Sequence, residues 1–304
     1  SPNLLANRDN LVATDIVDRF KVIRFLPGIS VYSELLEFLE KKAGYRRGNW
    51  NIRLSGDYQD TYYIFAYDWR RDNVESARLL MQNIEKLKAK LKKPDLKFDI
   101  IAHSMGGLIS RYAAMYGKAD LAENQKPTWA GAKHFDKIFL LGTPNEGSMN
   151  ALETLYSGYS IDTPIAGRIR PGYLNRRVAF TIPSIYQLLP HGKTARFYDE
   201  NLKPLQLNVY DPAIWKKYGW TILSDKDYQA KTSKVKRAEA ERYFQVVLRR
   251  ARLFHQALSV KTAVPKSPAF YVYGSDCKNT LNGAVIYFDK EKENWKTLTD
   301  GDSF

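Results

Sequence analysis

One stretch of the chain, an apolar run that stops at a serine between small residues, constrains the fold most strongly. Residues 97–102 predict a short buried strand, and residues 102–106 (AHSMG) follow, with Ala where the nucleophile-elbow pattern has its first Gly. Because this turn is tight, we expect small residues two before and two after Ser104. Residues 107–116 predict an amphipathic helix, whose N-terminus favours developing negative charge. The stretch therefore predicts a strand–turn–helix that holds the Ser104 hydroxyl above a sheet edge; a plain strand–turn–helix connection is the alternative.

Strands alternate with helices on both sides of this stretch. Further strands are predicted at residues 20–26, 61–67, 137–141 and 269–273. A long amphipathic helix, capped by Asp72 or Asn73, follows the second of these strands. Short loops between strands and helices imply a parallel sheet covered on both faces. The predicted fold class is therefore α/β, doubly wound, with Ser104, residues 67–70 and residues 142–148 at the sheet edge where ligands bind.

The alternation stops in the second half of the chain. Residues 149–263 contain several prolines, among them Pro183, Pro190, Pro204 and Pro212, many aromatic residues and a long charged helix, but no regular sequence of strands and helices. We interpret this segment as a cap inserted over the active edge, between core segments 1–148 and 264–304. The alternative is a separate domain without a role at the site. After the strand at 269–273, Asn282-Gly283 is typical of a hairpin turn and leads into a strand at 284–289.

Composition narrows the possible partners. The chain has 304 residues, 44% of them apolar, which is enough for a sizeable core, and it has no run of eighteen apolar residues. Its net charge of +14 is concentrated in residues 86–97, 168–177 and 226–252. We interpret these clusters as solvated helix faces, or alternatively as attraction to an anionic membrane surface. No recognition motif for nucleic acid accompanies the charge, so we expect no nucleic-acid partner.

Nothing in the residue pattern indicates a metal or cofactor. Cys277 is the only cysteine, the four histidines are scattered, and no carboxylates are spaced like a ligand set. We therefore expect neither a metal site nor a cofactor. The chain begins with Ser rather than Met, so the compartment cannot be read from its start.

A serine hydroxyl needs a histidine to accept its proton and a carboxylate to orient that histidine. The backbone N–H of Met105 follows Ser104 and is positioned to stabilise an oxyanion. Asp276, after the strand at 269–273, and Asp302, near the C-terminus, are the candidate acids, and either is alternatively an ordinary loop aspartate.

The histidine is harder to assign, because none of the four follows either aspartate, as the chain order Ser–acid–His requires. We expect His103 to point into the sheet, and His134 to lie at the opposite edge. His191 and His255 fall in the predicted cap and are interpreted as ordinary polar or surface residues, with His191 kept as an open candidate.

Four motifs, in this order and spacing, resemble the lecithin–cholesterol acyltransferase family. They are residues 67–70 (YDWR), 102–107 (AHSMGG), 141–148 (LGTPNEGS) and 271–274 (YVYG), and residues 186–190 (YQLLP) are similar to a segment of the family's cap. The resemblance implies an α/β-hydrolase fold with a lipid-facing inserted cap. It also implies acyl transfer from a phospholipid to water or to another alcohol.

The resemblance also implies roles for single residues. Ser104 matches the family's nucleophile, and Asp302 matches the aspartate of the family's Gly-Asp-Gly-Thr-like segment, here residues 301–304 (GDSF). Asp302 is therefore preferred to Asp276. Asp68 and Arg70 are interpreted as structural support, since an Asp–Arg pair more often braces a loop than reacts.

The chain departs from the family pattern at both ends. The family's histidine comes after the aspartate segment, and this sequence stops two residues past Asp302. Pro27-Gly28 resembles a second Pro-Gly turn of the family more closely than the turn that donates to the oxyanion. We therefore expect a sequence trimmed at both ends, with the catalytic histidine beyond Phe304.

These observations lead to one expected function and one alternative. The expected function is a serine lipase, phospholipase or O-acyltransferase that uses a Ser–Asp–His triad on phospholipid-type esters. The alternative is a catalytically inactive module with the same fold that binds a lipid surface or a protein.

Overall fold

The structure, a computed structural model, describes residues 9, 11–16, 19–20, 29–30, 32–51, 60–159, 174–277, 280–291 and 294–298. Its central sheet consists of β5 (Phe98–His103), β6 (Phe135–Leu141) and β9 (Ala269–Tyr273) in the order β5-β6-β9, with both pairs parallel. Apolar and β-branched residues dominate all three strands, as buried parallel strands require. The three strands predicted from these residues are thereby confirmed.

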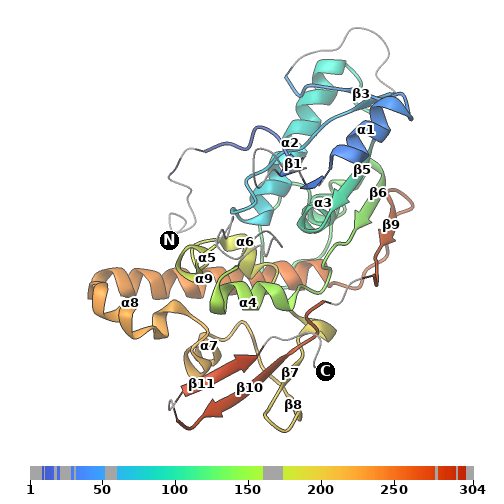
Figure 1. Ribbon diagram of the computed structural model, residues 1–304. Helices are drawn as coiled ribbons and strands as arrows, with labels where there is room; N and C mark the ends of the chain where they lie inside the picture. The colour runs from blue at the N-terminus through green and yellow to red at the C-terminus, as the bar shows by residue number, and fades with distance from the viewer. Residues whose placement is uncertain are drawn as a thin grey trace.

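Two helices cover one face of this sheet (Figure 1). They are α2 (Asn73–Leu91) and α3 (Met105–Tyr116); α3 packs on β5 and β6, and α2 packs on α3. The Asp72 carboxylate caps α2 by accepting from the N–H of Val74 at 2.9 Å, as its sequence predicts. On the other face Ile101, Tyr271 and Tyr273 keep exposed side chains, so the described residues leave that face more open than the predicted double cover.

The edge strands differ from the prediction. Only Phe20 of the predicted strand at 20–26 is described; it pairs through β1 (Arg19–Phe20) with β2 (Ile29–Ser30). Of the predicted strand at 61–67, only β4 (Thr61–Tyr62) forms a ladder, parallel to β3 (Arg46–Arg47). Beyond β4, the Ile64 carbonyl accepts a hydrogen bond from a side chain instead, Trp50 Nε1, at 2.6 Å.

The segment predicted as a cap is built from short elements and one long helix. These are α4 (Met149–Ser157), α5 (Arg176–Ala179), α6 (Pro183–Tyr186), β7 (Phe197–Tyr198), β8 (Pro204–Leu205), α7 (Pro212–Tyr218), α8 (Lys226–Lys231) and α9 (Lys234–Leu258). Single-turn 3₁₀ helices lie at Gly192–Thr194 and Ile222–Ser224 of this segment. Outside it, the described helices include α1 (Ser33–Lys41) and a 3₁₀ turn at Ala132–His134. None of the described helices has the length and apolar character needed to cross a membrane.

A second sheet joins this segment to the C-terminal strands. β10 (Ala284–Asp289) and β11 (Asn294–Leu298) form a hairpin, and the sheet order is β11-β10-β7-β8. The prediction of a hairpin turn at Asn282-Gly283 is wrong, because β9 and β10 lie in different sheets. The physical reason is a competing contact: the Ala284 N–H donates to the Arg196 carbonyl at 3.0 Å, and Arg196 Nη1 donates to Asn282 Oδ1 at 2.5 Å.

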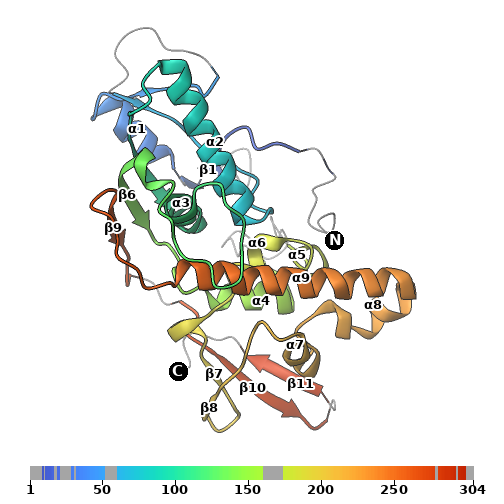
Figure 2. The same ribbon diagram turned by 180° about the vertical axis from the view of Figure 1, so that it is seen from behind.

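α9 runs between the two parts of the molecule in both views (Figures 1 and 2). Its first buried residues belong to a hydrophobic cluster with α4, α6, α7 and β10, and its last belong to the cluster of α2, α3, β5 and β6. The residues in the first group are Phe244, Val247, Leu248 and Ala251, and those in the second are Phe254, Ala257 and Leu258. An ion pair adds to this junction, since Arg250 Nε donates to the buried Asp72 carboxylate at 2.5 Å.

Candidate active site

Ser104 sits on the turn between β5 and α3 in a backbone conformation that few residues adopt. Its φ of 52° and ψ of −125° lie in the left-handed half of conformational space, where a side chain costs about 1–3 kcal/mol. The turn is held by two backbone hydrogen bonds, from Ser104 N–H to Leu141 O at 2.9 Å and from Gly107 N–H to Ser104 O at 3.0 Å. The strand–turn–helix of the elbow pattern is therefore present, with a half-buried serine at its apex.

The close approach that makes this turn possible involves Gly107 rather than Gly106. A Cβ at Gly107 would lie 2.0 Å from Thr143 Oγ1, whereas a Cβ at Gly106 would meet nothing nearer than Tyr67 Oη at 3.8 Å. The residue two after the serine is small, as expected, and a Cβ there would make only ordinary contacts. The tight position is one residue later, where α3 packs on the loop after β6.

Met105 is the first residue of α3 and is buried. The first N–H groups of a helix have no carbonyl partner within the helix, so they are able to donate to an anion that lies at the helix N-terminus. This position fits the predicted oxyanion donor.

The prediction that His103 points into the sheet is wrong. Side chains alternate along β5, so the buried Ala102 faces the helices and His103 faces the opposite, exposed side. Its Nδ1 is 2.9 Å from the Tyr32 hydroxyl, and the two rings meet edge to face at 5.7 Å.

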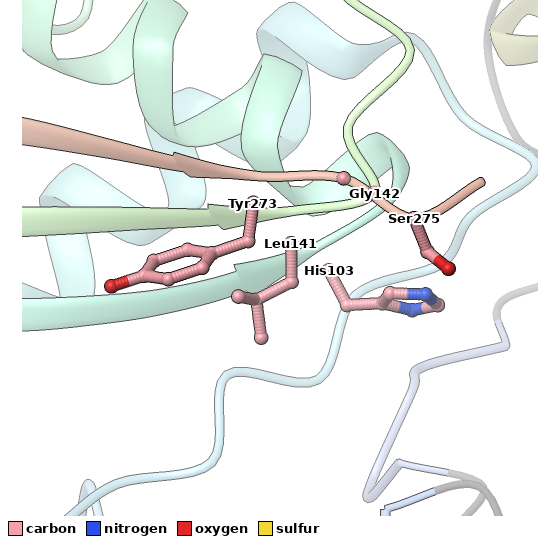
Figure 3. Close-up of a pocket in the computed structure, with 6 residues that line it drawn as sticks. His103, Leu141, Gly142, Tyr273 and Ser275 are labelled. Carbon is pink, nitrogen blue, oxygen red and sulfur yellow. The ribbon is translucent and has the colours of Figure 1, made fainter. Parts of the chain in front are cut away.

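An open hollow of about 250 Å³ lies at the carboxyl ends of β5, β6 and β9. Figure 3 shows that His103, Leu141 and Tyr273 point to the same side of the sheet and that Ser275 lies beside the His103 ring. The carboxyl edge predicted to bind ligands is therefore hollowed directly next to the elbow.

Tyr67 reaches the first turn of α3 from a distant part of the sequence. Its ring stacks on Phe65 at 5.7 Å and packs against the core cluster of α2 and α3, and its hydroxyl lies next to Gly106. Burial, with a smaller contribution from the nearby Tyr32 phenol, raises the pKa of Tyr67 to about 12.

The Asp68–Arg70 pair braces the turn that follows Tyr67. Arg70 donates to both carboxylate oxygens of Asp68, at 2.8 and 2.6 Å, and its Nη1 also contacts Asp9 at 2.7 Å. The hydrogen bond from Arg70 lowers the pKa of the Asp68 carboxyl, although burial opposes it. The Trp69 carbonyl accepts from the Ser184 hydroxyl at 2.5 Å, which ties this turn to α6.

Only one of the two candidate acids lies within the described residues. Asp276 lies in the exposed loop after β9, one residue beyond Ser275 of the hollow. Asp302 lies outside the described residues, and so does the Pro27-Gly28 turn. The structure thus brings together Ser104, Met105 and the sheet edge, while the acid stays a prediction.

The histidines of the predicted cap form a stacked pair rather than separate surface residues. The rings of His191 and His255 are 3.9 Å apart and inclined by 12°. His255 is buried, with Nε2 2.8 Å from the Gln187 carbonyl and Nδ1 2.7 Å from the Tyr210 hydroxyl. His191 Nδ1 is 3.2 Å from the Leu189 carbonyl, and burial lowers the pKa of His191.

His134 lies immediately before β6, at the sheet edge opposite the elbow, as predicted. Its Nδ1 accepts from the buried Lys88 ammonium at 3.2 Å. Across the described ranges, no three histidine, cysteine or carboxylate side chains converge as a metal would require.

Known proteins share this sequence pattern and geometry. The family model for lecithin:cholesterol acyltransferase matches residues 10–273. Phospholipid:diacylglycerol acyltransferase 1 of Arabidopsis thaliana is 24% identical over 204 residues, which make up 65% of this chain and 27% of the plant protein. This chain therefore spans little more than a quarter of that relative's length.

A solved structure supports the fold. A chain in the crystal structure of the Tle4-Tli4 complex aligns with a TM-score of 0.55 at 16% identity, over 76% of this chain and 48% of that chain. At this identity the likeness concerns the fold alone. Together with the parallel sheet and the elbow turn, it confirms the predicted α/β-hydrolase-like fold.

Proposed function

The chain belongs to the lecithin:cholesterol acyltransferase family, and from that premise we propose that it is a serine-dependent lipid acyl hydrolase or acyltransferase acting on phospholipid-type esters. The observation that carries the proposal is the Ser104 backbone, whose φ of 52° is maintained by packing around the turn. Strain of this kind persists where the surrounding structure over-determines it, and it is concentrated at active sites.

The proposed reaction has two steps. The Ser104 oxygen attacks the ester carbonyl while a histidine takes the hydroxyl proton, and the leaving alcohol departs with a proton from that histidine. Water or a second alcohol then attacks the acyl-enzyme and regenerates the serine. The Met105 N–H stabilises the oxyanion in both steps, and Asp302 orients the histidine.

We propose that the histidine of this triad is none of the four in this sequence. The support is that the four histidines of this sequence are engaged elsewhere. His103 contacts Tyr32, His134 contacts Lys88, and His255 is held by Gln187 and Tyr210. His191 is stacked on His255 and its Nδ1 lies 3.2 Å from the Leu189 carbonyl, while its buried Nε2 has no hydrogen-bond partner among the described residues.

The division of the molecule also enters the proposal. We propose that residues 1–148 and 264–304 form the catalytic core and that residues 149–263 form a cap that receives the lipid, with β10 of the former joined to β7 of the latter in one sheet. The hydrogen bonds from Ser184 to Trp69 and from the Asn73 N–H to Gln187 Oε1, at 2.7 Å, support a cap held close to the carboxyl edge of the sheet.

Ser104→Ala tests the proposal in the full-length protein. Fluorophosphonates phosphonylate an activated serine, so the wild-type protein is expected to be labelled and the Ser104→Ala variant is not. Ser110→Ala is the matched control, since Ser110 lies two turns along α3 and its hydroxyl is held by the Gly106 carbonyl at 2.8 Å. Labelling that survives in Ser104→Ala would contradict the proposal.

A negative result in the wild-type protein has a defined meaning. If the full-length protein is folded, is not labelled and hydrolyses no ester, the inactive lipid- or protein-binding module becomes the better interpretation. Equal labelling of the wild-type and Ser110→Ala proteins, with none in Ser104→Ala, leaves the catalytic function as the only one consistent with the site.

A further inference from the structure

The Tyr67 hydroxyl lies beside the first turn of α3. Its hydroxyl oxygen is 3.8 Å from the position that a Cβ would take at Gly106, the second residue of α3. The N-terminus of α3 is also the position of Ser104 and of the Met105 N–H. The Tyr67 phenol therefore flanks the same small volume from a segment 37 residues before the serine, by the numbering of the chain.

The Tyr67 hydroxyl is not needed for packing. The Tyr67 ring already stacks on Phe65 and packs on the core cluster, contacts that phenylalanine would make equally well. None of the described residues exchanges a hydrogen bond with the hydroxyl, whereas Tyr112 and Tyr116, in the same core, donate to the carbonyls of Ala119 and Ala257. The Tyr67 oxygen is also absent from the described side-chain atoms that are buried without a partner, so the hydroxyl is accessible and free to donate to a ligand.

The neighbouring polar groups keep this edge suited to negative charge that develops on a ligand. The Tyr32 hydroxyl lies near Tyr67 and contacts His103 Nδ1, and no carboxylate contributes to the electrostatic surroundings of the Tyr67 phenol among the described residues. With a pKa raised to about 12 by burial, the Tyr67 phenol keeps its proton throughout the neutral pH range and remains a donor.

We propose that Tyr67 is a further catalytic residue: its hydroxyl donates a hydrogen bond to the ester carbonyl oxygen as that oxygen becomes an oxyanion. This inference rests on the proposed acyl-transfer function. The phenol transfers no proton, and its hydrogen bond adds to the one from the Met105 N–H. Such a bond is stronger to the oxyanion than to the neutral carbonyl, so it lowers the barrier rather than the energy of substrate binding.

Tyr67→Phe is the test, measured as kcat and KM for a phospholipid ester with the full-length protein. Loss of one oxyanion donor lowers kcat by roughly 10²-fold, and KM is expected to stay within about twofold. Tyr62→Phe is the matched control: it removes a hydroxyl from the same segment, one that donates to Glu40 of α1 (Ser33–Lys41) at 2.5 Å. Its kcat is expected to remain within about twofold of the wild type.

The outcomes separate this inference from the function on which it rests. A kcat for Tyr67→Phe within about twofold of the wild type, or a change confined to KM, would overturn the role of Tyr67 while Ser104→Ala still abolishes labelling. Activity that survives in Ser104→Ala would remove both proposals together. The thermal unfolding midpoint distinguishes a structural effect, since Tyr67→Phe is expected to unfold within a few degrees of the wild type; a large drop together with the loss of kcat would also overturn the inference.

Discussion

At the scale of single residues, His255 links the folded state to pH. The imidazole is 3% exposed, and burial, with repulsion from His191, lowers its pKa to about 3 from an ordinary value of 6.5. The unfolded chain therefore binds this proton at a higher pH than the folded chain does. Stability is independent of this group above about pH 6.5 and falls as the pH decreases from about 6.5 towards 3.

Acidification is expected to destabilise the protein through this residue. Between about pH 7.5 and 4.5, linkage through His255 removes about 3 kcal/mol from the free energy of unfolding, because each pKa unit corresponds to about 1.4 kcal/mol. His255→Gln is expected to be less stable at neutral pH but to lose about 3 kcal/mol less on acidification. Urea unfolding at the two pH values measures this difference.

An NMR titration provides an independent measurement. The ring resonances of His255 in the folded wild-type protein are expected to remain those of a neutral imidazole at about pH 5. A midpoint near 6.5, or equal pH dependence of the wild type and His255→Gln, would show that burial does not control this residue.

Sequence reasoning at the residue scale succeeded where the signal was local. The turn at Ser104 was predictable because its small residues are adjacent in sequence. The contacts of Tyr32 with His103 and of Tyr67 with Gly106 join segments far apart in sequence, and nothing local indicates them. Tyr67 was inside a recognised motif, however, and its position at the end of an apolar run was the available signal.

At the scale of elements, α3 is positioned by a contact between its first turn and the loop after β6. Gly107 allows this contact, because Thr143 Oγ1, Cγ2 and Cβ would all lie within 3.0 Å of a Cβ at position 107. Thr143 is β-branched and therefore stiff, so it cannot move aside at low cost.

Gly107→Ala is consequently expected to destabilise the protein by about 1–3 kcal/mol, the usual cost of overpacking. Gly106→Ala is the matched control, since its methyl group would make only ordinary contacts and alanine favours the helix by about 0.5–1 kcal/mol. Thermal unfolding of both variants measures the difference. Equal stability of the two would show that the Thr143 contact does not position α3.

The elements of the central sheet were predictable, whereas their partners were less so. β5, β6, β9 and β10 appear at the predicted places, because uninterrupted apolar runs are strong local signals. The pairing of β10 with β7 was not predictable, because it depends on contacts between Arg196 and residues 282–284, which are far apart in sequence. The local pair Asn282-Gly283 indicated a hairpin instead. Asp302 stays a prediction from its motif alone.

At the scale of the whole molecule, the charge of +14 leaves two interpretations, solvated helix faces or attraction to anionic lipid surfaces, and the second can be tested. Two of the basic clusters are described over most of their length. The lysines of residues 86–97 surround the C-terminal end of α2, which leaves the sheet at the edge opposite Ser104. The cluster that begins at Lys226 includes the exposed start of α9, with Lys234, Lys236 and the exposed Val235.

We expect the full-length protein to co-sediment with vesicles that contain phosphatidylserine at low salt and to be released at about 1 M salt, where the Debye length falls to about 3 Å. The paired change Lys234→Gln and Lys236→Gln is expected to weaken binding roughly thirtyfold, at about 1 kcal/mol for each lysine. The matched control changes Lys86 and Lys92, at the end of α2, to Gln. Binding that persists at high salt, or equal effects of the two pairs, would contradict an electrostatic surface at the start of α9.

The length of α9 determines how far one of its ends moves when the other end tilts. Its 25 residues form a rod about 37 Å long, anchored in the core cluster near Leu258 and in the other cluster through Phe244 and Val247. A tilt of about 5° around the Leu258 end would displace the Lys234 end by roughly 3 Å. A small change in side-chain packing next to α3 would therefore produce a larger displacement at the Lys234 end of α9. A reporter dye attached at that end would register it.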